Sequence, residues 1–248
     1  MLVASLGRKL RPDQEQMEDV LTSQVLGACR YLPAAAGWAP LLAAARTLDG
    51  APLPMPRPED PVVSRFWPRW RHPDGRQTEP DVVVRWPGAL LVIEAKYRSG
   101  KSSKADPSRP EVTDQLGRQL VLARDHAAAE GRAFGVLYLT ADVLRPTRAL
   151  LESLAEVRQK RGWAPRVHLA WASWTDLRAG LSAFEGGPPG TMRLCSDAVR
   201  YLDQLGFGGF GGVKARVPAP APWRFAHAPR FLVPPQPAPW RFGAAHDP

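Results

Sequence analysis

Two apolar runs on either side of a proline-glycine turn constrain the fold of this chain more than any other feature. Residues 81–86 and 89–97 are rich in valine, leucine and isoleucine, and Pro87-Gly88 separates them. Such a pattern is typical of a β-hairpin. Strands that are apolar at consecutive positions belong to sheets that are covered on both faces. The sequence therefore predicts an α/β domain with this hairpin at the centre of its sheet.

Three charged residues interrupt the apolar pattern at one end of the hairpin. If the loop has two residues, or four with the same centre, Trp86 faces Ala89 and Asp81 lies opposite Glu94. Lys96 then projects from the same face as Glu94, because side chains alternate along a strand. A loop of odd length would place the two acids on opposite faces, and a Pro-Gly type II turn fits a hairpin poorly. The even register brings two carboxylates and an ammonium together.

Carboxylates that face each other repel unless a cation lies between them. Oxygen ligands at this spacing suit Mg²⁺, which keeps several water molecules and accepts a phosphate oxygen. Lys96 would then orient or deprotonate a water molecule, or stabilise charge on the phosphate. The alternative is an ordinary ion pair between Glu94 and Lys96, with Asp81 simply beginning a strand. We favour metal-assisted phosphodiester hydrolysis, because charges inside a buried sheet are costly unless they are paired or bind metal.

These residues resemble the motif of the PD-(D/E)xK nuclease superfamily: Pro80-Asp81, a spacer of twelve residues, and Glu94-Ala95-Lys96. The resemblance implies a restriction-endonuclease-like fold, with a central mixed sheet of four to five strands flanked by helices. Its elements would follow the order helix, three antiparallel strands, helix, strand. The resemblance also implies that Asp81 and Glu94 bind Mg²⁺, for which Mn²⁺ can substitute, and that Lys96 assists the attacking water.

Two further positions are suggested by the resemblance alone. Relatives place a glutamate of the first helix near the metal, for which Glu18 is the first candidate and Glu15 the second. Relatives also carry a glutamine on the helix after the second motif, and Gln115 stands there as an auxiliary catalytic residue. Position 119 is glutamine where many relatives have an aromatic residue, which leaves the exact subfamily open. For Glu18 and Gln115, an ordinary role at a helix terminus or surface remains an alternative.

Hydrophobic periodicity elsewhere in the chain fits the expected order of elements. Residues 1–206 form the predicted nuclease-like domain, in which the Ala- and Pro-rich segment 32–61 connects the first helix to the first strand and contains a short helix near 41–48. Helices are expected at 12–30, 111–130, 147–161, 175–185 and 191–205, and further strands at 62–70, 134–140 and 166–173, with a turn at 72–75.

The tail, residues 207–248, is rich in glycine and proline, is basic, and repeats Pro-Ala-Pro-Trp-Arg-Phe at 220–225 and 237–242. We favour a disordered tail that the chemistry does not need. The alternatives are stacking on nucleic-acid bases, binding to a partner domain, or packing against the core.

The charge of the chain points to a polyanionic partner. Its formal net charge is +9, and the loop after the motif strand carries Arg98, Lys101 and Lys104, which we expect to contact nucleic-acid phosphates. The predicted function is a magnesium-dependent deoxyribonuclease acting in DNA defence, restriction or repair, as a homodimer or in a larger assembly; RNA is not excluded as substrate. The rival is a catalytically inactive protein of the same fold that binds nucleic acid or supports an assembly.

No apolar run approaches about 18 residues, so we expect no membrane partner and a soluble cytoplasmic protein.

Overall fold

The computed structural model describes residues 18–72, 75–163 and 168–208. The chain divides into two units, residues 1–210 and 211–248, and the second lies outside the described residues. The same holds for the predicted first turns of the N-terminal helix with Glu15, and for both Pro-Ala-Pro-Trp-Arg-Phe repeats.

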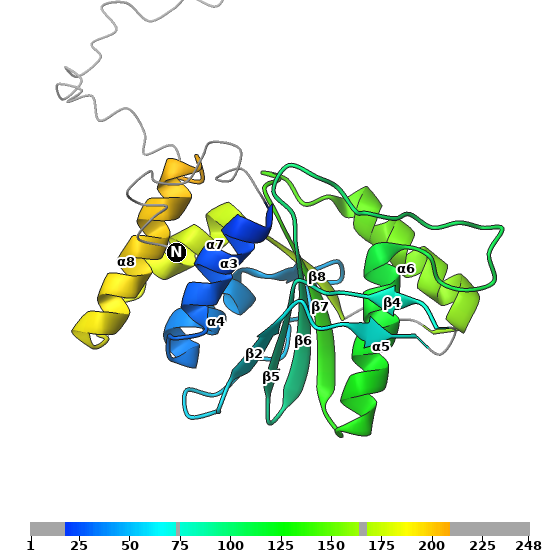
Figure 1. Ribbon diagram of the computed structural model, residues 1–248, viewed down its shortest axis with the longest axis horizontal. Coiled ribbons are helices and arrows are strands. Elements are labelled where there is room, and N and C mark those ends of the chain that lie inside the picture. Colours follow the sequence, from blue (N-terminus) through cyan, green and yellow to red (C-terminus); the bar gives the residue numbers. More distant parts are fainter. Residues whose placement is uncertain (1–17, 73–74, 164–167, 209–248) are drawn as a thin grey trace, which may run out of the picture. The chain divides into compact units, whose positions relative to one another are not determined.

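A mixed sheet of six strands forms the centre of the first unit (Figure 1). Strands β2, β5 and β6 are antiparallel to one another, β7 and β8 continue the sheet parallel to β6, and β1 pairs antiparallel with β8 at the far edge. The spatial order is β1-β8-β7-β6-β5-β2. The strands are β1 (Arg46–Thr47), β2 (Val63–Phe66), β5 (Val82–Trp86), β6 (Ala89–Ala95), β7 (Ala133–Thr140) and β8 (Leu169–Ser173).

The predicted α/β class is confirmed, but the sheet has six strands rather than four to five. The additional strand is β1, which lies within the segment 32–61 that we had expected to be a connection. Its two residues are too few to display an alternating pattern, because a strand is recognised in sequence from about four residues upward. The pairing of Arg46 and Thr47 with β8 therefore left no signal in the sequence.

The hairpin has the even register that the sequence predicts. Trp86 pairs with Ala89 and Val82 pairs with Ile93 across a two-residue turn. Alternate residues of β6 consequently belong to different faces of the sheet, with Leu91 on one face and Leu90 on the other. Both faces are buried along the whole strand, as the continuous apolar run indicated.

The predicted strand over residues 62–70 is interrupted. Strand β2 ends at Phe66, and Trp67 has a φ of 48°, a left-handed conformation that breaks the pleat. Pro68 follows and has no N–H to donate to a ladder. Strand pairing resumes in a separate two-stranded sheet, in which β3 (Trp70–Arg71) pairs with β4 (Gln77–Thr78). These two strands lie on either side of the expected turn at 72–75.

The helices form where hydrophobic periodicity placed them, and the largest changes of boundary fall in two of them. The helix expected over 111–130 begins only at Gln115, because the Asp114 side chain accepts a hydrogen bond from Gly117 N at 3.0 Å and caps the first turn. The short helix expected near 41–48 instead spans Ala34–Ala44. The helices are α3 (Glu18–Cys29), α4 (Ala34–Ala44), α5 (Gln115–Ala129), α6 (Thr147–Arg161), α7 (Trp174–Ser182) and α8 (Pro189–Gln204).

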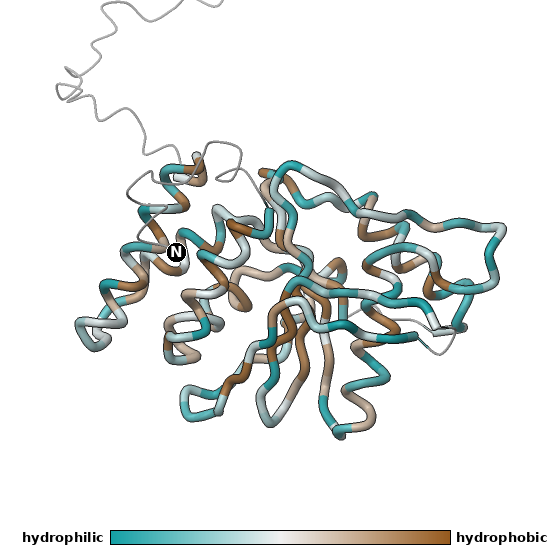
Figure 2. Tube along the Cα trace, in the orientation of Figure 1, coloured by the Kyte–Doolittle hydropathy of each residue, from teal (hydrophilic) through white to brown (hydrophobic). Residues whose placement is uncertain are grey.

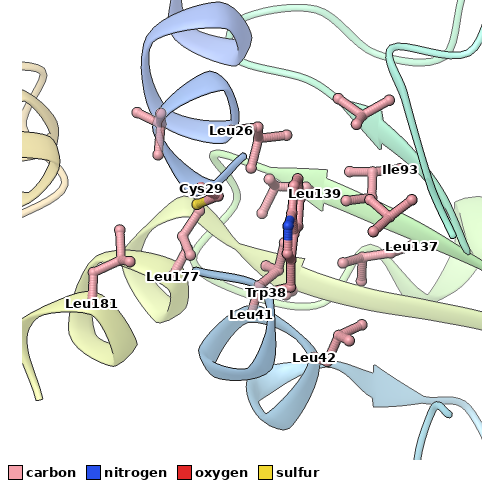
Figure 3. Close-up of a cluster of buried hydrophobic side chains, with 14 of the residues drawn as sticks. Leu26, Cys29, Trp38, Leu41, Leu42, Ile93, Leu137, Leu139, Leu177 and Leu181 are labelled. Atoms are coloured by element: carbon pink, nitrogen blue, oxygen red, sulfur yellow. The ribbon is translucent and has the colours of Figure 1, made fainter. Parts of the chain in front are cut away.

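Two helical layers cover the sheet. Helices α3, α4, α7 and α8 lie on one face, and α5 and α6 on the other (Figure 1). Figure 3 shows part of the first layer, where Leu26 and Trp38 from the helices meet Ile93 and Leu139 from the sheet. Both cysteines, Cys29 and Cys195, are buried free thiols.

Polar sequence is concentrated at one end of the sheet. Figure 2 shows hydrophobic central strands and a mainly hydrophilic loop between β6 and α5. This loop, residues 97–114, starts at the end of β6 that carries the predicted motif. Within the described part of the chain, no helix combines the length and the apolar character needed to cross a membrane.

Candidate active site

The hairpin brings the two motif carboxylates together. Asp81 directly precedes β5 and Glu94 lies near the end of β6, on the face of the sheet that α5 covers. The Asp81 carboxylate accepts a hydrogen bond from Ala95 N at 2.7 Å, so it is tied to the residue that follows Glu94. Lys96 follows immediately, and its backbone is fixed because its N–H donates to Leu139 O at 2.8 Å and its carbonyl accepts from Trp174 Nε1 at 3.0 Å.

Glu94 is the most deeply buried member of the group, with 1% of its surface exposed. Three donors surround its carboxylate. Lys96 Nζ lies 2.6 Å from Glu94 Oε1, and Gln115 Nε2 donates to the same oxygen at 2.5 Å. Gln119 Nε2 donates to the other oxygen. The buried charge therefore has a partner on each oxygen, as a buried carboxylate requires.

Glu18 reaches the same point from the opposite helical layer. Its carboxylate accepts hydrogen bonds from Lys96 Nζ at 2.8 Å, Tyr97 N at 3.0 Å and Ser99 Oγ at 2.6 Å. Lys96 thus bridges Glu18 and Glu94. Glu18, the first candidate for the metal-binding glutamate, lies at the start of α3 and is brought to the group by its bond to Lys96.

Gln119 is a further member of the site, although the sequence comparison with the nuclease motif noted it only because many relatives have an aromatic residue there. It is fully buried, and it lies one helical turn beyond Gln115 on the same face of α5. That spacing was the signal that could have identified it. Its Oε1 atom is buried and has no hydrogen-bond partner within the described part of the chain.

The group of Glu18, Asp81, Glu94 and Lys96, here called the acidic cluster, carries three carboxylates and one ammonium. Burial, followed by the charge of Glu94, raises the pKa of Asp81 to about 7. Burial also raises the pKa of Glu94, against the opposing effect of Lys96. For Lys96, burial alone would lower the pKa, but the surrounding carboxylates outweigh it and the pKa is raised. Lys96 is therefore firmly protonated, and the cluster carries surplus negative charge when its acids are ionised.

The donor set of the acidic cluster fits a hard divalent cation. Carboxylate oxygens are the ligands that Mg²⁺ prefers in proteins, and a surplus of two negative charges would be neutralised by one such ion. Among residues 18–72, 75–163 and 168–208, no three His, Cys, Asp or Glu side chains stand as a ready-made metal site. The bridging position between Glu18 and Glu94 is taken by the ammonium of Lys96.

The basic loop after β6 divides into surface and interior residues. Arg98 and Lys104 are exposed, and the Arg98 guanidinium lies 5.1 Å from the centre of the Tyr97 ring. Lys101, in contrast, has a side chain only 4% exposed. Its ammonium binds Asp114, Ala149 O at 3.0 Å and Ser153 Oγ at 3.0 Å. Lys101 is thus an internal anchor of the loop, which contradicts the phosphate contact expected for it.

A second buried polar network supports the loop and the start of α5. Glu156 on α6 accepts hydrogen bonds from Thr113 N at 3.0 Å and Asp114 N at 2.8 Å, and pairs with Lys160 at 2.6 Å. With Lys101 and Ser153, these residues form what we call the anchor network. The loop residue next to Lys101 is linked to the acidic cluster through Gln115, because Ser102 N donates to Gln115 Oε1 at 2.7 Å and Gln115 donates to Glu94. The bond from Ser102 orients the amide of Gln115 so that its nitrogen faces Glu94.

Comparisons of this chain with protein-family models, with curated proteins and with solved structures found no match.

Proposed function

We propose that this chain is a magnesium-dependent nuclease that hydrolyses phosphodiester bonds in DNA, with a restriction-endonuclease-like core. The observation that carries the proposal is the acidic cluster: three carboxylates and one lysine, contributed by α3, by the residue before β5 and by the end of β6, at one end of a buried sheet. A surplus of buried negative charge destabilises a fold unless it serves to bind a cation.

The order of the elements supports the same proposal. If α4, β1 and the separate β3–β4 sheet are set aside, helix α3 is followed along the described chain by the antiparallel strands β2, β5 and β6, then by helix α5 and the parallel strand β7. This is the order that the resemblance implies for a restriction-endonuclease-like core. The resemblance also implies metal binding by Asp81 and Glu94 and assistance by Lys96, and these side chains lie together.

Each residue of the cluster has a defined part in the proposed reaction. Asp81, Glu94 and Glu18 would hold the cation, which supplies Lewis-acid activation of the phosphate and of a bound water molecule. Lys96 is protonated, so it acts as a hydrogen-bond donor that stabilises charge on the phosphate rather than as a base. Gln115 touches Glu94 and therefore acts as a positioning residue that fixes the carboxylate.

DNA would reach this end of the sheet past the exposed cations of the loop. Arg98 and Lys104 are the two residues of the predicted phosphate-binding set that remain at the surface. Contacts between such side chains and the DNA backbone add affinity without reading sequence. A net charge of +9 is consistent with this partner.

Lys96 also supports a second candidate function. An ammonium that bridges two carboxylates keeps the cluster paired without metal, as in a nuclease-like fold that has lost catalysis and serves to bind nucleic acid or to support an assembly. This candidate predicts DNA binding that is insensitive to Mg²⁺ and that survives Glu94→Ala.

The deciding experiment is incubation of the wild type with supercoiled plasmid and with linear single- and double-stranded DNA, in Mg²⁺, Mn²⁺ or EDTA. We expect metal-dependent cutting that is lost in Asp81→Ala, Glu94→Ala and Lys96→Ala. Glu152→Ala, which removes a partly exposed carboxylate on α6 that pairs with Arg148, is the matched control and should cut normally. Cutting that persists in all three site variants would refute the nuclease. Equal binding without cutting would favour the second candidate.

A further inference from the structure

A cavity with charged residues in its wall lies between the residues that flank β3 and β4 and those of α5 and α6. Its volume is about 310 Å³. Three arginines line it: Arg76 next to β4, Arg118 on α5 and Arg161 at the end of α6. His72 and Glu111 complete its polar wall. We call this cavity the arginine pocket.

The pocket holds more positive charge than its described lining balances. Among the described residues that line it, Glu111 is the only carboxylate, and Glu111 is shared between Arg76 at 3.7 Å and Arg109 at 3.1 Å. Within the described residues, Arg161 forms no ion pair or hydrogen bond. Among the described lining residues, three guanidinium groups thus stand beside one carboxylate, while Asp114, Glu156 and Glu94 act on Arg118 from outside the lining.

Arg118 shows this imbalance most clearly. Within the described chain, its hydrogen bonds go only to neutral oxygens: Thr78 Oγ1 at 3.3 Å, Ser103 Oγ at 2.9 Å and Thr113 O. Burial, followed by the charge of Arg76, lowers the pKa of Arg118. The bonds fix the guanidinium in place, while no described carboxylate lies within hydrogen-bond distance of its charge. An anion in the pocket would remove the repulsion between the arginines.

The position of the pocket links it to the proposed reaction. Arg118 lies on α5 between Gln115 and Gln119, the two residues that hold Glu94. Thr78, which contacts both Arg118 and His72, is three residues before Asp81, a distance of at most about 10 Å along the chain. Phosphates repeat about every 3.4 Å of axis along one strand of B-DNA. The pocket is therefore within about three nucleotides of the acidic cluster.

We propose that the arginine pocket binds a phosphate group of the DNA strand, a few nucleotides from the bond that the acidic cluster cleaves. The proposal rests on the proposed function. Guanidinium groups match phosphate oxygens in geometry and form paired, charge-assisted hydrogen bonds with them. The cavity volume stands at the lower end for ligand pockets, which suits a phosphate with its sugar. The phosphate is either internal to the strand or at its 5′ end.

The test measures binding rather than cutting. Fluorescent single-stranded oligonucleotides with a 5′-phosphate or a 5′-hydroxyl are titrated with protein in EDTA at several salt concentrations. The variants are Arg161→Gln and Arg118→Gln. Arg200→Gln is the matched control, because it removes one partly exposed arginine from α8, in the opposite helical layer.

We expect each pocket variant to raise Kd at least tenfold, against less than twofold for Arg200→Gln. The slope of log Kd against log salt should fall by about 0.7 for each phosphate of a single strand that the variant no longer neutralises. Weaker binding of the 5′-phosphate oligonucleotide alone identifies a terminal phosphate, and equally weaker binding of both identifies an internal one. Effects equal to those of the control, or no DNA binding by the wild type, would overturn the proposal.

Two features of the design keep the result interpretable. Arg161 is exposed at the end of its helix, so Arg161→Gln decides the question if Arg118→Gln does not fold. The nuclease proposal is judged separately, by the cutting assay. DNA binding that depends on the arginines, without cutting, would support the arginine pocket and refute the nuclease. Cutting, with DNA binding that does not depend on the arginines, would support the nuclease and refute the arginine pocket.

Discussion

Replacing Asp81 with asparagine should stabilise the metal-free protein at pH 8 and leave its stability near pH 4 almost unchanged. The reason is the raised pKa of the Asp81 carboxyl, which burial and the neighbouring Glu94 shift from 3.8 to about 7. A folded-state pKa above the unfolded value means that the folded protein holds its proton more tightly. Stability is therefore lost as the pH rises between these two values. Asparagine stays neutral throughout, and its carbonyl oxygen can still accept the hydrogen bond from Ala95 N.

The size of the effect follows from the same pKa. One pKa unit corresponds to about 1.36 kcal/mol, so a rise from 3.8 to about 7 gives about 4 kcal/mol. Between pH 5 and pH 8 only the upper two units are crossed, which leaves about 2.7 kcal/mol. Asp81 is partly exposed, and screening by water reduces the effect. We therefore expect Asp81→Asn to gain about 1–3 kcal/mol relative to the wild type on going from pH 5 to pH 8.

The assay is urea unfolding in EDTA at pH 5 and pH 8, followed by circular dichroism. Glu59→Gln, which neutralises an exposed carboxylate outside the acidic cluster, gives the background. At pH 8, Mg²⁺ should raise the free energy of unfolding of the wild type and have little effect on Asp81→Asn. If Asp81→Asn were destabilised equally at both pH values, the reasoning would fail, because a difference in stability that does not depend on pH would mean that the pKa of Asp81 is not raised by folding.

Two further perturbations test the structure around the site. Lys101→Met should lower the free energy of unfolding by about 3–5 kcal/mol, because it leaves the buried carboxylate of Asp114 unpaired. The control Lys104→Met replaces an exposed lysine and should change the free energy of unfolding by less than about 0.5 kcal/mol. Equal effects of the two substitutions in urea titrations would show that Lys101 is not buried. Gly180→Ala should cost about 1–3 kcal/mol, since its Cβ would lie 2.6 Å from Pro40 Cβ. Gly27→Ala in α3 meets no atom within 4 Å and should be neutral or stabilising by up to about 1 kcal/mol; thermal melts that rank the two alanine variants the other way would contradict the packing of α7.

Local patterns in the sequence predicted the elements on which the acidic cluster stands. The apolar runs around Pro87-Gly88 indicated the hairpin, and a two-residue loop at that turn gives the register observed, in which Trp86 pairs with Ala89. The helix at 147–161 has the predicted bounds, and it closes at Gly162 in a left-handed conformation. In both cases the deciding interactions lie within a few residues of each other.

Long-range pairing decided what the sequence could not show. Lys101 lies in a polar segment of the kind that usually forms a surface loop. Nothing near it in sequence indicates that Asp114 and Ser153 enclose its ammonium. The backbone of Trp67 adopts a conformation that is rare for a non-glycine residue, and it is held there by a hydrogen bond from its N–H to Asp81 O at 3.0 Å. Gln119 is different, because its one-turn spacing from Gln115 was visible in the sequence.

The two charged groups at this end of the sheet differ in a way that bears on function. The anchor network has two ammonium groups and two carboxylates, paired as Lys101 with Asp114 and Lys160 with Glu156. Because each buried charge there has its counter-charge, the network needs nothing beyond the protein. The acidic cluster lies just across the loop and has three carboxylates for one ammonium. The same fold can thus balance buried charge where only structure is required. A local imbalance that the surrounding structure tolerates is typical of functional sites, and its sign and its oxygen donors suit the divalent cation that we propose.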